Sequence, residues 1–216
     1  MLEIMKMDVV KYAQLAERQG LCQHRSGNFS ARDLKTGYIC ITPTGMDRAE
    51  LTYKDIVVIN MDAEIVEAST GLRPTSDALM HIAAYKARPD VLAVAHTHSR
   101  YATVLGVLGK SIPAVVYDIS LLGCRKGYVP SVADARPGSE KLAANISDPL
   151  KISDALLLQK HGAVAVGGNI KEALLKAEYI ESLADVYYHA LVLNHGEEPP
   201  VIPLQDLEWT YPAAIK

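Results

Sequence analysis

The sequence predicts an α/β protein in which a central mixed β-sheet is flanked by helices. Helix-like apolar periodicity occupies both ends of the chain, and short apolar runs typical of buried strands lie between them. The 216 residues contain no Ser/Gly-rich linker, low-complexity tract or internal repeat. We therefore expect a single domain over residues 1–216.

The composition favours small-molecule chemistry inside the cell. An apolar fraction of 49% supports a substantial core, yet no apolar run reaches the roughly 18 residues that cross a bilayer. The net charge of −3 argues against sequence-independent nucleic-acid binding. The N-terminus lacks a basic segment before an apolar one, and the 3 cysteines are odd in number and widely spaced. We expect a cytoplasmic protein with reduced cysteines and no membrane partner.

Periodicity and breaker residues place the elements. Gly20 is expected to end the first helix, and Pro89 to end a helix near Arg88, because the residue before proline disfavours the α region. Helices are expected over residues 3–19, 74–88, 101–108, 138–147 and 170–194. Strands are expected over residues 38–41, 56–60, 64–67, 91–95, 112–119 and 155–158. Residues 123–137 and the aromatic, proline-rich tail, about 195–216, are expected to be irregular, with the tail packing at a subunit border.

Three histidines follow two of the apolar runs. His96 and His98 end the 91–95 run, and residues two apart in an extended chain point to the same side. His161 follows the 155–158 run in the same way. One histidine of the pair could cap a strand while the other packs, but a third in an equivalent place favours an open catalytic site for zinc or another divalent metal. Asp77, at the start of the preceding helix, is a further candidate ligand.

Short polar segments lie next to the predicted strands and helices. Residues 26–30 read as a polar turn in which Asn28 offers both a donor and an acceptor, and residues 42–45 form a hydroxyl-bearing turn. Thr75, Ser76 and Asp77 follow Pro74 as a helix-start signature. Turn formation and helix capping alone would explain these residue types. The remaining four histidines do not follow apolar runs and are expected to be structural or exposed. They are His24, His81, His189 and His195.

Six motifs in order, GNFS, TPTG, PTSD, HTHS, IPAVVYD and QKHG, resemble the class II aldolase and adducin-head family over about residues 7–193. The resemblance implies that family's single-domain, largely antiparallel sheet, a homotetramer, and zinc bound by His96, His98 and His161. It also implies a substrate-phosphate site, which the free N–H groups and dipole of a helix N-terminus would favour. Its expected residues are Asn28, Thr44, Gly45, Thr75 and Ser76.

Within the family, the chain resembles aldolases that cleave L-fuculose 1-phosphate in its length and in its IPAVVYD segment. Such an enzyme reversibly forms dihydroxyacetone phosphate and an aldehyde through a metal-stabilised enediolate. The resemblance assigns acid/base roles to Asp77 and Tyr117, and Tyr211 matches a C-terminal catalytic tyrosine.

Other family activities stay open. Asp77 and HTHSRYAT resemble L-ribulose-5-phosphate 4-epimerase, because the aldolase has glutamate where this chain has Asp77. Related sugar-acid decarboxylases or dehydratases are further alternatives. A non-enzymatic adducin-like module is disfavoured, because such modules lack the histidines that this chain retains.

Overall fold

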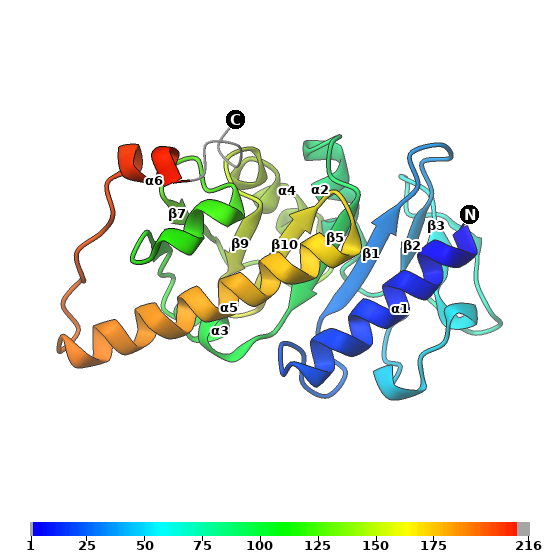
Figure 1. Ribbon diagram of the computed structural model, residues 1–216. Helices are drawn as coiled ribbons and strands as arrows, with labels where there is room; N and C mark the ends of the chain where they lie inside the picture. Colours follow the sequence, from blue (N-terminus) through cyan, green and yellow to red (C-terminus); the bar gives the residue numbers. More distant parts are fainter. Residues whose placement is uncertain (1, 211–216) are drawn as a thin grey trace.

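The computed structural model describes residues 2–210, and its centre is an eight-stranded sheet in the order β4-β3-β2-β1-β5-β10-β9-β8 (Figure 1). Neighbouring strands are antiparallel except β8 and β9, which are parallel. The strands are β1 (Asn28–Arg32), β2 (Ile39–Ile41), β3 (Val57–Ile59), β4 (Ile65–Glu67), β5 (Ala93–Thr97), β8 (Ser131–Val132), β9 (Ala155–Leu158) and β10 (Gly162–Gly167). A separate two-stranded sheet pairs β6 (Ile112–Pro113) with β7 (Tyr128–Val129). The predicted mixed sheet flanked by helices is confirmed.

Helices cover both faces of the sheet. In Figure 1, α1 (Leu2–Arg18) and α5 (Ile170–Leu193) cross the near face, and α2 (Ala78–Ala87) and α4 (Glu140–Ser147) lie behind. Strand residues alternate between the two resulting cores: Ala93 and Ala95 pack with α1, α5 and α3 (Arg100–Val107), whereas Val94 packs with α2 and α4. The fully buried β5 therefore carries apolar side chains on both faces.

Two central strands were not predicted. The sequence predicts a turn over residues 26–30, but Asn28 opens β1. It predicts no strand over residues 162–167, which form β10. Both strands pair directly with β5. β1 contains the polar residues Asn28 and Ser30, and glycine and alanine make up much of β10. Neither segment therefore shows the usual composition of a strand.

Further expectations need correction. Residues 123–137, expected to be irregular, contain the short strands β7 and β8. The strand expected over residues 112–119 ends at Pro113, which lacks the N–H needed to continue a ladder, and a 3₁₀ helix, η3 (Tyr117–Leu122), follows. The tail is not wholly irregular, because α6 (Leu204–Thr210) forms there. Leu207 is buried in the chain's own core, and α6 contacts η3. The subunit-border role of the tail stays a prediction.

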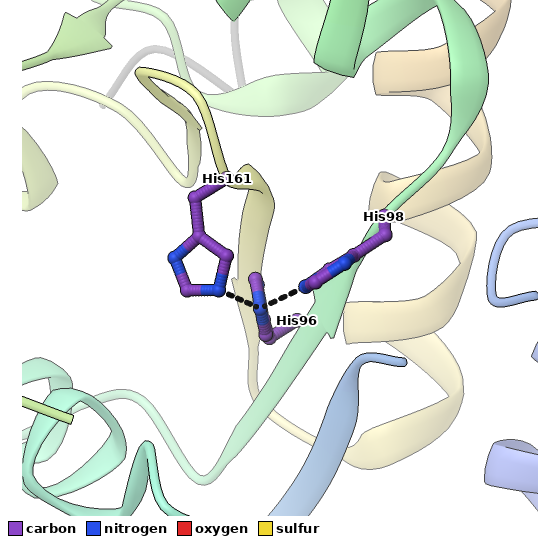
Figure 2. Close-up of side chains that lie close together, drawn as sticks. All are labelled: His96, His98 and His161. Carbon is purple, nitrogen blue, oxygen red and sulfur yellow. Dashed lines mark hydrogen bonds between the residues drawn. The ribbon is translucent and has the colours of Figure 1, made fainter. Parts of the chain in front are cut away.

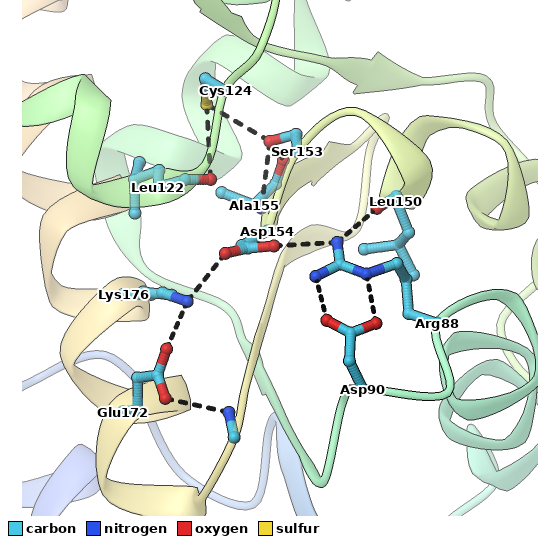
Figure 3. Close-up of polar contacts among 11 residues, drawn as sticks. Arg88, Asp90, Leu122, Cys124, Leu150, Ser153, Asp154, Ala155, Glu172 and Lys176 are labelled. Atoms are coloured by element: carbon cyan, nitrogen blue, oxygen red, sulfur yellow. Dashed lines mark hydrogen bonds and ion pairs between the residues drawn. The ribbon is translucent and has the colours of Figure 1, made fainter. Parts of the chain in front are cut away.

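A polar network at the start of β9 joins the two helical layers (Figure 3). Asp154 accepts hydrogen bonds from Arg88 at the end of α2, at 3.0 Å, and from Lys176 of α5, at 2.8 Å. Asp90 and Glu172 supply the remaining anionic partners of the two cations. The network therefore fixes the ends of α2 and α5 relative to the sheet.

The cysteines lie in the protein interior. Cys22, Cys40 and Cys124 are all free and buried. No helix within residues 2–210 is both long and apolar enough to cross a membrane.

Candidate metal centre

The three predicted histidines converge at one end of the central strands (Figure 2). His96 is the fourth residue of β5, and its Cα partners are Asn28 on β1 and Val164 on β10. His98 follows the end of β5, and His161 lies in the tight turn between β9 and β10. The turn is closed by Lys160, whose φ is +57°. Strand ends therefore position all three imidazoles.

The Nε2 atoms of the histidines point toward one another. His96 Nε2 lies 3.0 Å from His98 Nε2 and 3.2 Å from His161 Nε2. His96 is fully buried, and His98 and His161 are partly buried. Three nitrogen donors that meet in this way match the ligand set of an open divalent-metal site.

Hydrogen bonding fixes the tautomer of His96. Its Nδ1 lies 2.9 Å from the carbonyl oxygen of Ala163 and donates to it, so Nε2 carries the free lone pair. Gly162 permits this close packing, because a Cβ at that position would meet the Thr97 carbonyl and lie 3.0 Å from His98 Cδ2. The absence of a side chain at Gly162 of β10 thus leaves room for Thr97 and His98.

Burial keeps the imidazoles neutral. It lowers the pKa of His96 well below its usual value, and the neighbouring His161 and His98 add to the effect. Burial also lowers the pKa of His98 to about 4. The pKa of His161 is lowered by burial too, although Asp77 opposes the shift. Neutral imidazoles are the form that binds metal.

Asp77 lies beside the histidines instead of capping its helix. It occupies the N-cap position of α2, but its side chain makes no capping hydrogen bond. Its Oδ2 accepts a 3.0 Å hydrogen bond from Asn28 Nδ2 and lies 3.9 Å from His96 Nε2 and 4.0 Å from His161 Nε2. Thr75 Oγ1 accepts from the backbone N–H of Asp77 at 3.4 Å, which is the hydrogen bond of a local turn before the helix.

The residues present fit a divalent cation. Asp77 Oδ1 is buried without a hydrogen-bond partner among the described residues, and an unpartnered buried carboxylate oxygen is costly. A cation held by the three Nε2 atoms would sit beside this carboxylate. Imidazole nitrogens with a nearby carboxylate suit zinc and similar transition metals.

The predicted phosphate residues gather next to Asp77. Thr42 is bonded to Phe29 of β1 through both its backbone N–H and its side-chain Oγ1, so loop 42–45 lies beside the start of β1. Thr44 N donates to Arg73 O, and Thr75 N donates to Thr42 O, so loops 42–45 and 73–76 run side by side. Gly45 adopts the left-handed φ of +70°. Thr44, Gly45 and Ser76 are exposed, whereas Asn28 and Thr75 are buried.

Arg48 supports this region and was not predicted. It is buried, and its Nη2 donates to the carbonyl oxygens of Ser26 and Gly27, which hold the segment before Asn28. Arg48, Gly27 and Thr42 line a small cleft. Gly27 has a φ of +73°, and a Cβ there would lie 2.6 Å from His96 O. A buried cation next to the segment preceding Asn28 was not recognisable without the fold.

The predicted catalytic Tyr117 is not part of this cluster in one chain. Tyr117 opens η3 with 49% of its side chain exposed. Within residues 2–210, no hydrogen bond joins it to Asp77 or to the three histidines. Tyr211 lies outside the described residues. His81, expected to be only structural or exposed, is fully buried and bonds to Asn28.

A three-histidine centre with an adjacent carboxylate, set at the strand ends of a mixed sheet, defines a protein of the class II aldolase type. The sequence profile described as "Class II Aldolase and Adducin N-terminal domain" matches residues 7–188. The chain belongs to this family, which confirms the resemblance carried by the six motifs.

Relatives and solved structures agree. The chain is 32% identical over 208 residues to 5-deoxy-D-ribulose 1-phosphate aldolase of Bacillus thuringiensis serovar kurstaki, covering 96% of this chain and 94% of that protein. It is 37% identical over 191 residues to L-fuculose phosphate aldolase of Escherichia coli strain K12, covering 88% of this chain and 84% of the relative. A solved structure of L-fuculose 1-phosphate aldolase superposes with a TM-score of 0.88 at 32% identity, covering 95% of this chain and 93% of that one. The expected class, a metal-dependent aldehyde-lyase, is confirmed.

Proposed function

We propose that this enzyme is a zinc-dependent aldolase that reversibly cleaves a ketose 1-phosphate to dihydroxyacetone phosphate and an aldehyde. The observation that carries the proposal is the convergence of His96, His98 and His161 beside Asp77, whose buried Oδ1 has no hydrogen-bond partner in the described part of the chain. Retro-aldol cleavage breaks the C3–C4 bond, leaves an electron pair on C3 and turns the C4 hydroxyl into the aldehyde. A bound divalent cation would supply Lewis-acid stabilisation of the negative charge that develops beside the carbonyl.

Asp77 is proposed to handle the proton at C3. It is buried, and Asn28 holds one of its oxygens at 3.0 Å, so the other oxygen is the one available for proton transfer. The phosphate is proposed to bind Asn28, Thr44, Gly45, Thr75 and Ser76. Because Ser76 directly precedes Asp77, a phosphate on C1 would lie near the reacting carbons.

Tyr117 is proposed to transfer the proton of the aldehyde oxygen, and Tyr211 to assist. Since Tyr117 is half-exposed on η3 within one chain, this role requires that it meet the histidine centre of another copy or that η3 shift. A cytoplasmic homotetramer is the assembly we propose. Sedimentation that gives a stable, fully active monomer would contradict that assembly.

The substrate is proposed to be a ketose 1-phosphate such as L-fuculose 1-phosphate or 5-deoxyribulose 1-phosphate. These are the compounds named for the two relatives described above, and both carry their phosphate on the dihydroxyacetone half. The aspartate at position 77 keeps L-ribulose-5-phosphate 4-epimerase, or a related decarboxylase, as the alternative. The relatives named as aldolases favour cleavage over epimerisation.

One experiment separates these activities. Zinc-loaded protein is incubated with L-fuculose 1-phosphate, 5-deoxyribulose 1-phosphate and L-ribulose 5-phosphate, and dihydroxyacetone phosphate and xylulose 5-phosphate are measured. We expect cleavage of a 1-phosphate, slowed about 10²- to 10⁴-fold by Tyr117→Phe. Asp77→Glu should keep or raise cleavage, because the longer side chain reaches toward C3. Epimerised product without dihydroxyacetone phosphate would overturn the aldolase assignment.

A non-enzymatic, adducin-like role is tested separately. Protein purified without chelator is analysed for metal by mass spectrometry. We expect close to one divalent ion per chain, with zinc predominant. Metal-free protein that also fails to bind added zinc would favour a binding module.

A further inference from the structure

An unbroken series of buried hydrogen bonds leads away from Asp77 between β1 and α2. Asn28 Nδ2 lies 3.0 Å from Asp77 Oδ2, and His81 Nε2 lies 2.5 Å from Asn28 Oδ1. Ser30 Oγ lies 2.7 Å from His81 Nδ1 and 2.6 Å from Tyr85 OH. None of these five residues is more than 5% exposed. Burial of so many linked polar groups is tolerated only when each finds its partner.

The spacing of the residues explains the series. Asp77, His81 and Tyr85 are four residues apart, so they form one stripe of α2. Asn28 and Ser30 are two apart on β1, so they share the face of the sheet that α2 covers. The polar stripe of the helix therefore lies directly on the polar residues of a central strand.

The direction of every hydrogen bond follows from the charge on Asp77. An ionised carboxylate only accepts, so Asn28 must present its NH₂ group to Asp77 and its carbonyl oxygen to His81. His81 must then donate from Nε2, which leaves Nδ1 to accept from the Ser30 hydroxyl. Ser30 in turn accepts from the hydroxyl of Tyr85.

The protonation states agree with this direction. Burial lowers the pKa of His81 to about 4, so one ring nitrogen remains an acceptor at neutral pH. Burial also raises the pKa of Tyr85 well above its usual value, so its hydroxyl remains a donor. The series has a single internally consistent arrangement.

We propose that His81 is a positioning residue for the acid/base group Asp77. His81 fixes the Asn28 amide so that it holds Asp77 Oδ2, the carboxylate oxygen that faces His96 Nε2 and His161 Nε2, and Ser30 and Tyr85 hold His81 in the required tautomer. Oδ1 has no hydrogen-bond partner among the described residues. The inference rests on the proposed function, because it gives Asp77 its catalytic role. The series orients the carboxylate and does not carry protons, since a side-chain amide does not readily pass a proton along.

The tautomer of His81 is the first test, and it does not depend on activity. Long-range ¹H–¹⁵N correlation spectra of ¹⁵N-histidine-labelled protein at pH 7.5 report which ring nitrogen carries the proton, with His81→Gln providing the assignment. We expect a neutral ring protonated at Nε2. A ring protonated at Nδ1, or a doubly protonated ring, would overturn the proposal.

Kinetics of two substitutions are the second test. His81→Leu removes both nitrogens, whereas His81→Gln keeps a donor for Asn28. We expect His81→Leu to lower kcat about 10- to 100-fold, as loss of a supporting hydrogen bond does at metal sites, with KM within about twofold and metal content unchanged. His81→Gln should recover most of kcat. His189→Leu, at an exposed site on α5, is the matched control and should behave as wild type.

The outcomes separate this inference from the proposed function. If wild-type protein cleaves no ketose phosphate, the proposed function fails while the tautomer measurement still tests the series. If wild type is active but His81→Leu and His81→Gln lose activity equally, or lose it only in step with their melting temperatures, His81 has a purely structural role and the proposal is wrong.

Discussion

Asn28 lies directly opposite His96 in the antiparallel ladder between β1 and β5. Asn28 also donates to Asp77 at 3.0 Å, so one pair of facing residues fixes both the first histidine and the carboxylate. Because backbone hydrogen bonds between two central strands hold this pair, the position of Asn28 relative to His96 does not depend on a loop. Sites built on regular elements are held more rigidly than sites built on loops.

Replacing His96, His98 or His161 by alanine should remove bound metal and activity together. Each side chain supplies one of the three nitrogens that converge at the centre within residues 2–210, so two remaining ligands would bind a metal weakly. Metal content is measured by mass spectrometry after gel filtration, and cleavage is measured on the same samples. His24→Ala, at an exposed loop position, is the control. Full metal content in all three variants would rule out this site.

Ser76→Ala and Asn28→Ala should have distinguishable effects. The Ser76 hydroxyl is exposed beside Asp77, and losing a hydrogen bond to a charged phosphate costs roughly 1.5–3 kcal/mol, so KM should rise about 10- to 150-fold. Unphosphorylated sugars should be affected little. Asn28→Ala should also lower kcat, because it releases Asp77. If Ser76→Ala lowers activity equally on phosphorylated and unphosphorylated sugars, Ser76 stabilises the fold and does not bind the phosphate.

The convergence of the three histidines was predictable from sequence because they follow apolar runs at fixed places. His96 ends the run that became β5, and His161 closely follows the run that became β9. The hydrogen bonds that hold Asp77 beside the histidines were not predictable in the same way. Asn28 and Ser30 look like turn residues until α2 is seen to cover them, because their partners His81 and Tyr85 lie about 50 residues further along the chain. The four-residue spacing of Asp77, His81 and Tyr85 was the available signal.

Asp154→Ala should lower stability by about 2 kcal/mol, because Arg88 and Lys176 are mostly buried and would each lose a charged hydrogen-bond partner. Urea unfolding monitored by circular dichroism measures the change. Asp148→Ala is the matched control, since the ion pair between Asp148 and Lys151 is exposed and its loss should change the stability little. Equal effects of the two substitutions would show that the network in Figure 3 does not join the helical layers energetically.

Lowering the pH should lower the free energy of unfolding over a pH range that is set partly by the pKa of His81. Burial lowers the pKa of His81 to about 4 in the folded protein, whereas an unfolded chain has a histidine pKa near 6.5. Between these values the unfolded state binds more protons, so the free energy of unfolding rises with pH. Stability from this group is therefore complete above about pH 6.5 and is lost as the pH falls toward about 4, by up to about 3 kcal/mol.

The contribution of His81 is isolated by comparing wild type with His81→Gln in the presence of chelator. Urea unfolding at several pH values between 4.5 and 7.5 gives the slope of the unfolding free energy for each protein. Because the variant lacks the titrating ring while the other histidines and carboxylates are common to both proteins, its slope should be smaller by up to about 1.4 kcal/mol per pH unit. We do not expect identical slopes, because His81 is fully buried between Asn28 and Ser30. Identical slopes would mean that the His81 ring takes up a proton as readily in the folded protein as in the unfolded chain, and would contradict this prediction.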